Sequence, residues 1–450
     1  MKKSLAGLSI LAVGGLTVAL SGCTGGTSGG GDDVLRVAYQ KTSSFTAMDD
    51  LMKTVKAEYE KQYPDREVEL VPIEAEQDQY FTKLALMNGS ADTAPDVIYE
   101  DTFQIRSDAA AGYLLPIDEY LAEWEDWDLY DEGAKQAGVG DDGKMYGVSL
   151  GTDTRGIYFN KDLFEAAGLP TDWQPTSWDE ILEAARAIKE SHPDVTPLNI
   201  YAAKTLGEAT SMQGFEMLLY GTGDELLDTS SNKWVAGSAG FRDALGFYET
   251  AFEEGLAPDP AEALDPGWGS KVQNELIPQS KLAIAIDGSW LPSGWIDGDN
   301  AWPEWQETMG LAAMPTQDGG GDGFTSMSGG WTLAVGANAD DPQAAFDFIA
   351  QAMTPENALT YHQQAGQIAV RSDVASSQEY LDYNPSFEFF SSLVQYTHFR
   401  PATPDYSQIS SNIPVATESV ITGQSSPEEA QKAYDEALIG IVGEDNVTAG

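Results

Sequence analysis

Short apolar runs alternate with helical spacings in the first part of the chain after residue 33. Apolar side chains recur at Leu51, Val55 and Tyr59, and this spacing predicts a helix that ends before Pro64. The pattern predicts, in order, a strand, a helix, a strand, a helix and a strand: residues 34–39, 47–63, 68–71, 80–87 and 96–99. This order is typical of a parallel sheet with helices on both faces.

Ligands bind beyond the carboxyl ends of the strands in sheets of this kind. We therefore expect ligand contacts in the loops that follow the three strands, at residues 40–46, 72–79 and 100–104. A second block also mixes strand-like and helical stretches: residues 145–150, 155–160, 178–190, 215–220, 241–254, 281–286, 328–335, 343–353 and 427–441. A chain of 450 residues is long enough for two domains, and the lack of a short repeat argues against a solenoid.

The N-terminus predicts export. Lys2 and Lys3 precede an apolar run at residues 5–20, which has the length of a signal-peptide core rather than of a membrane-spanning helix. The run leads into LSGC, which resembles the bacterial lipoprotein cleavage box, and Cys23 is the only cysteine of the chain. Residues 1–22 are thus predicted to be a signal peptide and Cys23 the lipidated residue, the alternative being an ordinary secretory peptide with a chance cysteine.

Residues 23–33 are rich in Gly and Ser and predict a flexible tether between the lipid and the folded body. No later segment reaches a transmembrane length. We therefore expect an exported protein that a lipid on Cys23 anchors to the outer face of the cytoplasmic membrane. With a single cysteine it has no internal disulfide, so core burial must stabilise it.

The charge balance argues against nucleic acid as a partner. The chain has 24 Lys plus Arg against 72 Asp plus Glu, a formal net charge of −48. Removal of residues 1–22 takes away two lysines and no acid, so the mature charge becomes −50. A surface this acidic repels DNA, RNA and anionic headgroups. It is typical of solubility in a salty medium, and because the acids are spread along the chain, a cation-binding role is the weaker alternative.

Sequence signatures of catalysis are missing. The chain has no phosphate-binding loop and no G-x-S-x-G motif. His192, His362 and His398 lie too far apart for a zinc motif, so we expect neither a metal nor a cofactor. The many carboxylates leave a glycosidase open as an alternative.

Two tryptophans stand in loop contexts. Trp290 follows Asp287-Gly288-Ser289, and Trp331 follows Gly329-Gly330. Such rings can stack on the apolar face of a sugar while carboxylates and amides bind its hydroxyls. Packing in the core is an equally good interpretation of either ring.

An ordered set of motifs identifies a resemblance. Segments along nearly the whole mature chain resemble motifs of the family 1 extracellular solute-binding proteins, the group that includes maltose- and trehalose-binding proteins. These segments are PDVIY (95–99), AAGYLLPI (110–117), DGKMYGV (142–148), GTDTRGIYFNKDLF (151–164), PTSWDE (175–180), AIAIDGSW (283–290), GGW (329–331) and AGQIAVR (365–371). The chain departs from the pattern at Ile284, where the family usually has methionine, and at Ala369, where it usually has proline.

The resemblance implies an α/β fold, namely the two-lobed periplasmic-binding-protein fold of type II, in which each lobe is a mainly parallel sheet flanked by helices. Lobe 1 is expected at residues 34–151 plus 316–366, and lobe 2 at residues 154–315 plus 367–450. A hinge would join the lobes, with the ligand between them. This arrangement suits a binder that closes on a polar solute and excludes water from its hydroxyls.

The function implied is that of an extracytoplasmic carbohydrate receptor of an ABC importer, with a di- or oligosaccharide favoured. The partners would be the permease subunits with their cytoplasmic ATPase, and the receptor would act as a monomer and not as an enzyme. An exported carbohydrate-active enzyme and a receptor for a non-sugar solute are the alternatives. The enzyme would turn over an oligosaccharide, whereas the receptor would bind it unchanged.

The resemblance also implies a set of ligand-binding residues. Asp153 would be a sugar-binding carboxylate at the hinge, and Trp290 a stacking platform on lobe 2. A solvated surface acid is the alternative for each carboxylate. The whole expected set is Lys41, Thr42, Glu100, Asp101, Gln104, Asp153, Trp290, Gly329, Gly330, Trp331, Arg371 and Tyr406. Loops 201–213 and 267–271 would set the sugar specificity, but their residues do not indicate which sugar binds.

We predict that Cys23→Ala abolishes membrane anchoring, because the thiol that would carry the lipid is lost. Membrane fractionation with a labelled fatty acid measures the effect. Ser21→Ala, which keeps the cysteine, is the matched control. A Cys23→Ala protein that stays in the membrane fraction and is processed normally would contradict the lipoprotein interpretation.

Overall fold

The structure is a computed structural model that describes residues 34–42, 45–75, 77–296 and 300–450. The predicted signal peptide, the tether and Cys23 lie outside the described residues. No helix within the described part of the chain is both long and apolar enough to cross a membrane.

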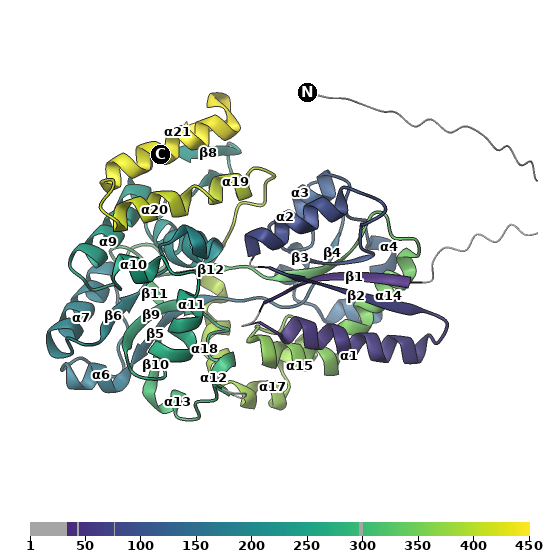
Figure 1. Ribbon diagram of the computed structural model, residues 1–450, viewed down its shortest axis with the longest axis horizontal. Coiled ribbons are helices and arrows are strands. Elements are labelled where there is room, and N and C mark those ends of the chain that lie inside the picture. Colours follow the sequence, from purple (N-terminus) through teal and green to yellow (C-terminus); the bar gives the residue numbers. More distant parts are fainter. Residues whose placement is uncertain (1–33, 43–44, 76, 297–299) are drawn as a thin grey trace, which may run out of the picture. The chain divides into compact units, whose positions relative to one another are not determined.

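One set of elements comes from the first third of the body and from a later segment (Figure 1). These elements are β1 (Val34–Lys41), α1 (Ala47–Gln62), β2 (Glu67–Glu74), α2 (Gln77–Asn88), β3 (Val97–Asp101), α3 (Ile105–Ala110), α4 (Asp118–Leu121), the 3₁₀ helix η1 (Glu125–Leu129), α5 (Glu132–Gln136), β4 (Gly147–Ser149), β13 (Trp331–Val335), α14 (Pro342–Ala352), α15 (Pro355–Ala365), α16 (Ser372–Ala375) and α17 (Gln378–Tyr383).

The second set comes from the middle and the end of the chain. Its elements are β5 (Arg155–Asn160), α6 (Lys161–Ala166), α7 (Trp178–Ser191), β6 (Thr196–Asn199), η2 (Lys204–Leu206), the π-helix η3 (Ala209–Glu216), α8 (Met217–Gly221), β7 (Leu227–Asp228), β8 (Lys233–Ala236), α9 (Ala239–Glu253), α10 (Pro260–Ala263), α11 (Trp268–Lys271), the π-helix η4 (Val272–Leu276), β9 (Leu282–Gly288), α12 (Ser293–Ile296), α13 (Trp305–Thr308), β10 (Met309–Ala312), β11 (Met314–Pro315), β12 (Phe324–Ser328), α18 (Ser386–Ser392), η5 (Leu393–Tyr396), β14 (Thr397–Phe399), α19 (Tyr406–Ser410), α20 (Ile413–Ile421), α21 (Pro427–Val442), η6 (Glu444–Asn446) and β15 (Val447–Ala449).

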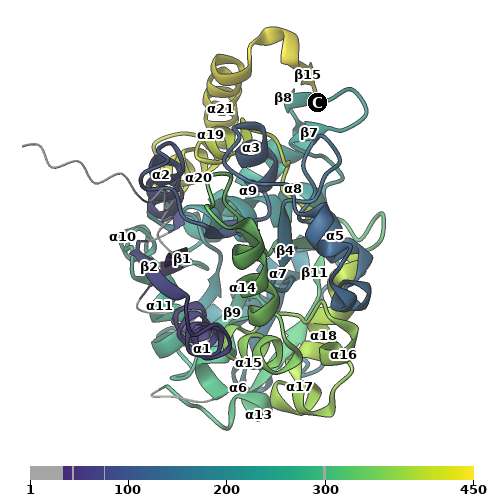
Figure 2. The same cartoon turned by 90° about the vertical axis from the view of Figure 1, so that its right-hand side faces the viewer.

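The first sheet has the strand order β2-β1-β3-β13-β4 among the described residues. β1 pairs in parallel with β2 and β3, as the sequence predicted, whereas β13 runs antiparallel to β3 and β4. Figures 1 and 2 show α1 and α15 on one face of this sheet and α2 and α3 on the other. Helix α1 buries Leu51, Val55 and Tyr59 against this core, which is the face that its apolar spacing predicted.

The second sheet has the strand order β10-β5-β9-β6. β6 is parallel to β9, but β5 runs antiparallel to both β9 and β10. This sheet is therefore mixed, where the resemblance implied a mainly parallel one. The difference arises because β9 and β10 lie far along the chain from β5. A local apolar pattern does not reveal in which direction such distant strands pair.

Buried apolar side chains divide into two large clusters and a smaller one. The first cluster surrounds the first sheet, and the second surrounds β5, β9, α7, α9 and α20. The smaller cluster contains Trp268 and Trp295 and lies at the same sheet as the second, since it includes Tyr158 of β5. The chain passes between the first cluster and the others near residues 150–154, 328–331 and 387–390, which we call the crossing segments.

The packing refines the expected lobe boundaries, which stay a prediction. Residues 324–328 form β12, which pairs with β11 and β14 and buries Met327 in the second cluster. Residues 369–387 bury Val370, Tyr380 and Phe387 in the first cluster. The later boundaries therefore fall near residues 329 and 388 rather than at 316 and 366. The sequence motifs indicated where strands occur but not which sheet each strand joins.

The first crossing segment contacts the second crossing segment and also residue 368. Thr152 and Ile368 exchange two N–H···O bonds of 3.0 and 2.8 Å. The Thr152 hydroxyl donates to the carbonyl of Gly329 at 3.1 Å. Gly330 has φ +147°, and a Cβ atom there would come within 2.6 Å of the Gly151 carbonyl oxygen, so only glycine fits this close approach.

His362 lies buried against the first crossing segment. Its Nε2 is 2.7 Å from the Leu150 carbonyl oxygen, and its Nδ1 has no hydrogen-bond partner among the described residues. Burial lowers the pKa of His362 to about 4, and the positive charge of Arg371 acts in the same direction. The ring is therefore neutral at neutral pH, with Nε2–H donating to Leu150.

We predict that His362 makes the fold sensitive to mild acid. The unfolded histidine takes up a proton near pH 6.5, but the folded ring does so only near pH 4, so stability falls as pH drops from 6.5 to 4 and levels off below. This contribution is about 3 kcal/mol. His362→Gln keeps a donor for Leu150 but does not titrate, so the variant should lose less stability than wild type over this range.

Urea unfolding of both proteins at several pH values measures the difference. The comparison at pH above 7 is the control for any packing cost of the substitution itself. If the two proteins lose stability in parallel between pH 6.5 and 4, His362 does not carry this pH dependence.

Candidate functional site

The crossing segments bring together buried polar side chains from both large clusters. We call this set the crossing group. Hydrogen bonds, ion pairs or a ring contact connect its members in two networks, one around Asp153 and Arg155 and one around Arg400, and Gly329 lies beside both. The crossing group is Asp101, Asp153, Arg155, Glu208, Glu216, Trp290, Gly329, Arg400 and Tyr406.

Asp153 lies on the first crossing segment and is almost fully buried. Its carboxylate pairs with Arg155 and accepts a hydrogen bond of 3.0 Å from the backbone N–H of Gly329. Arg155 also donates to the carbonyl of Met327 at 3.2 Å, while its buried Nε has no partner among the described residues. The carboxylate thus links the first crossing segment to the second.

Arg400 connects the two clusters. Its guanidinium lies 2.6 Å from Asp101, at the end of β3, and 3.3 Å from Glu208, which precedes η3. It also covers the ring of Phe103 at 4.4 Å from the ring centre. A Cβ atom at Gly329 would lie 3.1 Å from Arg400, so the glycine leaves room for the guanidinium.

Two glutamates flank the π-helix η3, a distorted helix type that is common at functional sites. The Tyr406 hydroxyl lies 2.7 Å from Glu216 and 3.2 Å from Glu208. Burial raises the pKa of Glu216 to about 8, and the charge of Glu208 adds to this shift. Glu216 therefore keeps its proton at neutral pH and can donate a hydrogen bond.

Trp290 follows β9, as predicted, and its ring is half-buried. The Arg155 guanidinium lies over the ring, 4.7 Å from its centre. The ring also packs on Gly288, where a Cβ atom would come within 2.1 Å of it. The sequence predicted an open stacking platform, but in this structure a cation already contacts the ring. Its role toward a ligand stays a prediction.

Other predicted residues at the end of β3 differ in their surroundings. Asp101 accepts a hydrogen bond of 3.1 Å from Gln77, and burial raises its pKa against the charge of Arg400. Glu100 is fully buried, and neither of its carboxyl oxygens has a hydrogen-bond partner among the described residues. Burial and the charge of Asp108 raise the pKa of Glu100 well above its ordinary value. Gln104 is half-buried, and its carbonyl begins α3.

The first ligand loop lies on the first cluster. Lys41 pairs with Asp49 at 3.0 Å, and the Thr42 hydroxyl accepts a hydrogen bond of 3.0 Å from the Phe45 backbone. Their role in binding stays a prediction.

Trp331 packs on aromatic side chains of the first cluster. Its ring stacks on Tyr99 at 4.2 Å with 8° between the planes and also contacts Tyr80 and Phe81. The neighbouring Gly330 shapes the second crossing segment through its backbone. Trp331 is half-buried, so packing accounts for most of this ring.

Arg371 is not brought to the crossing group. It is fully buried in the first cluster, where it pairs with Asp126 and Asp373 at 2.9 Å each. It also donates to the Met353 carbonyl and lies over the Tyr130 ring. Through these contacts, the arginine of the AGQIAVR motif packs within the first cluster.

Sequence reasoning missed four members of the crossing group. Glu216 falls in the predicted helix 215–220, where nothing in the sequence marked it. Arg400 was not predicted, although it is one of only 24 basic residues, and an arginine beside a Pro in a loop was the one available signal. Glu208 lies within the predicted specificity loop 201–213, but nothing marked it there. Arg155 stands in the GTDTRGIYFNKDLF motif, yet only Asp153 of that motif was selected. No group of three or more His, Cys, Asp or Glu side chains that could hold a metal ion occurs within the described residues.

A family model matches most of the chain. The bacterial extracellular solute-binding protein family matches residues 42–359. The chain belongs to this family. Members of the family are binding proteins. The two-lobed periplasmic-binding-protein fold of type II is confirmed by solved structures that cover nine-tenths of the chain.

Curated relatives of this solute-binding protein are distant. A Brucella abortus (strain 2308) relative, whose name says no more than binding protein, is 25% identical over 298 residues, which cover 65% of this chain and 66% of that protein. The chain thus spans slightly less than two thirds of this relative. The maltodextrin-binding protein MdxE of Bacillus subtilis (strain 168) is 23% identical over 371 residues, or 80% of each chain.

Solved structures match over more of the length. A solute-binding protein of an ABC transporter from Thermotoga lettingae TMO, bound with alpha-D-tagatose, has a TM-score of 0.76, 24% identity and coverage of 91% of this chain and 99% of that one. A maltose-bound protein from T. maritima also has a TM-score of 0.76, with 22% identity and coverage of 91% and 100%.

We predict that Asp101→Asn destabilises the unliganded solute-binding protein by about 3 kcal/mol, because it leaves the buried Arg400 charge with one partner fewer. The matched control is Glu254→Gln, which breaks an ion pair with Arg186 of the same 2.6 Å length but with both side chains 43% exposed. That loss should be much smaller, because water screens the exposed pair. Urea unfolding of the three proteins measures both, and equal losses would show that the buried position of Asp101 adds nothing.

Proposed function

We propose that this protein is the carbohydrate-binding receptor of an ABC importer and that it captures a di- or oligosaccharide between its two lobes. The observation that carries the proposal is the crossing group, in which both lobes contribute carboxylates, arginines, a tyrosine hydroxyl and a tryptophan, with Asp153 and Arg400 beside Gly329. Sugar hydroxyls need both donors and acceptors, and this group offers both. The maltose- and tagatose-bound relatives support the same class of ligand.

The binding residues that we propose are those that the crossing group contains. Asp101, Asp153 and Tyr406 would hold hydroxyls, and Trp290 would contact a sugar face after the Arg155 guanidinium moves. Arg400 and Glu208 join the proposed set, because they contact Asp101 and Tyr406 directly. Gly329 and Gly330 would admit the ligand close to the backbone. Lys41, Thr42, Gln104 and Trp331 have weaker support, and Glu100 and Arg371 have the weakest, because their contacts are buried within the first cluster.

The remaining parts of the proposal concern delivery. The receptor would be exported and held at the outer face of the cytoplasmic membrane by a lipid on Cys23. It would close on its sugar at the crossing segments and pass it, as a monomer, to the permease subunits with their cytoplasmic ATPase. The family assignment supports an extracellular binding role.

Two alternatives stay open to test. A carbohydrate-active enzyme would convert the sugar, whereas the receptor would release it unchanged. A receptor for a non-sugar solute would bind a different class of small molecule and ignore sugars.

Thermal unfolding against panels of sugars, amino acids, polyamines and short peptides tests the proposal. A sugar at about 100 times its Kd should stabilise the protein by about 2.7 kcal/mol through mass action. Stabilisation by a non-sugar panel alone would favour the second alternative. Release of a shortened sugar from the mixture would favour the enzyme.

We predict that Trp290→Ala weakens binding of the best sugar about tenfold, which is about 1.4 kcal/mol, because the ring surface beside Asp153 and Arg155 is lost. Calorimetry measures the Kd. The control is Trp302→Ala, another half-buried tryptophan of lobe 2 that packs on Trp295 away from the crossing group. Unchanged affinity in Trp290→Ala, or an equal loss in both variants, would return Trp290 to a packing role.

A further inference from the structure

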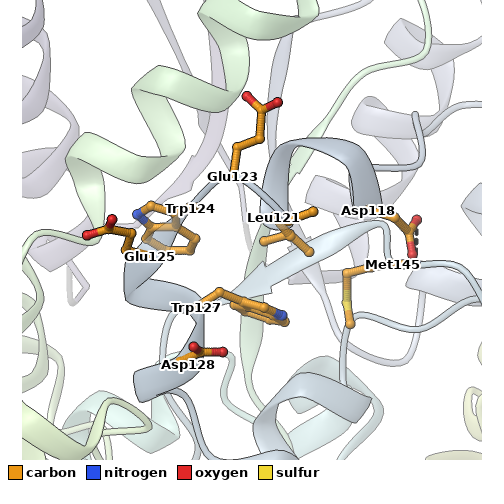
Figure 3. Close-up of a pocket in the computed structure, with 9 residues that line it drawn as sticks. Asp118, Leu121, Glu123, Trp124, Glu125, Trp127, Asp128 and Met145 are labelled. Atoms are coloured by element: carbon orange, nitrogen blue, oxygen red, sulfur yellow. Dashed lines mark hydrogen bonds between the residues drawn. The ribbon is translucent and has the colours of Figure 1, made fainter.

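A cavity lies on the first lobe, apart from the crossing group. It has a volume of about 460 Å³ and is formed by α4, by the residues around η1 and by a methionine before β4 (Figure 3). None of its lining residues belongs to the crossing group, and none was predicted to bind ligand. The lining residues are Asp118, Leu121, Ala122, Glu123, Trp124, Glu125, Trp127, Asp128 and Met145.

The centre of this cavity is apolar and aromatic. Figure 3 shows the indole rings of Trp124 and Trp127 beside Leu121 and Met145. The two rings are 6.2 Å apart with 23° between their planes. Trp124 is held edge-on to Phe346 at 5.8 Å, so the first cluster fixes its orientation. Both indoles are half-buried, which leaves part of each ring at the cavity.

The rim of the cavity is acidic and has no base. In Figure 3 Asp118, Glu123, Glu125 and Asp128 surround the apolar centre, and the carboxylates of Glu123 and Glu125 point outward from it. Asp118 accepts a hydrogen bond of 3.2 Å from the Met145 backbone. Within the part of the chain that the structure describes, the other three carboxylates have neither an ion pair nor a hydrogen bond, and no Lys, Arg or His lines the cavity. Their negative charge is therefore available to an outside cation.

The carboxylates by themselves do not form a metal site. They do not converge, since no cluster of three or more potential metal-ligating side chains occurs among the described residues. A compact divalent cation needs such convergence. A diffuse organic cation needs an electron-rich ring and a nearby negative field instead.

A second observation points to the same chemistry. The ammonium group of Lys135 lies over the Trp127 ring, 5.4 Å from its centre. Lys135 does not line the cavity, but its position shows that this indole already attracts an ammonium group within the fold. The pair formed by Trp124 and Trp127 extends the same electron-rich surface into the cavity.

We propose that this cavity binds a small quaternary ammonium ion. The methyl groups of such an ion would contact Leu121, Met145 and the two indoles, and its charge would face the unpaired carboxylates of the rim. A quaternary ammonium is weakly hydrated, so it loses less on leaving water than the ammonium of lysine does. The site is independent of the proposed sugar site, because the two share no residue.

The test compares choline with 3,3-dimethylbutan-1-ol, an uncharged molecule of nearly the same shape. Ligand-observed NMR and calorimetry at low ionic strength measure binding of each to the whole mature protein. Choline should bind at least about tenfold more tightly than the neutral analogue, and tetramethylammonium should compete with it. Equal binding of both molecules, or binding of neither, overturns the proposal.

Variants locate the site. Trp127→Leu should weaken choline binding about tenfold. Because that change also touches Tyr130, the double variant Glu123→Gln with Asp128→Asn is the second probe, since both side chains are exposed and fold-neutral. It should weaken choline binding and leave the neutral analogue unaffected.

The control is Glu119→Gln. It removes a charge from α4, the helix that borders the cavity, at a position that does not line the cavity. It should keep at least half of the choline affinity. Choline binding that survives both cavity variants unchanged, or that falls equally in Glu119→Gln, overturns the proposal. Sugar affinity serves as an independent readout, because the proposal expects it to be the same in all of these variants.

Discussion

Two buried guanidinium groups constrain the centre of this molecule. Arg155 and Arg400 are both almost fully buried where the chain crosses between the lobes. A buried charge costs several kcal/mol unless it is paired and hydrogen-bonded. The fold must therefore deliver carboxylates to these points, and it does so with Asp153 for one arginine and with Asp101 and Glu208 for the other. These pairs fix how the end of β3, the first crossing segment and the loop before η3 approach one another.

The same pairing affects what a ligand must offer. In this structure the donors of Arg400 and the acceptors of Asp101 satisfy each other. Under the proposed function, a solute that enters would have to replace these contacts with its own hydroxyls, because a donor or acceptor left unpaired would cost more than the new contact gains. Glu216, which keeps its proton at neutral pH, adds a neutral donor to a site otherwise made of fixed charges. Polyhydroxyl ligands meet these requirements, whereas apolar solutes do not.

The sequence predicted the local elements well, because apolar spacing records which face of a helix or strand is buried. Leu51, Val55 and Tyr59 of α1 are buried as their spacing indicated. It also selected Asp153, which stands in a specific motif. It could not reveal Arg400 as the partner of Asp101, because 299 residues separate the two and neither has a local signature. A motif also marked Arg371, whose ion pairs lie within the first cluster, so its role toward a ligand stays a prediction.

Acidic residues outnumber basic ones in the chain, 72 against 24. The carboxylates of the crossing group and those of the cavity nevertheless differ in whether basic side chains pair with them. In the crossing group, two arginines of the chain pair with Asp101, Asp153 and Glu208, so the fold itself offsets most of the negative charge there. In the cavity beside Trp124 and Trp127, carboxylates surround two indoles and no basic side chain lines the wall. Similar residue types therefore create opposite preferences. The difference lies in whether the fold pairs the carboxylates with cations of its own, and this follows from long-range packing rather than from composition.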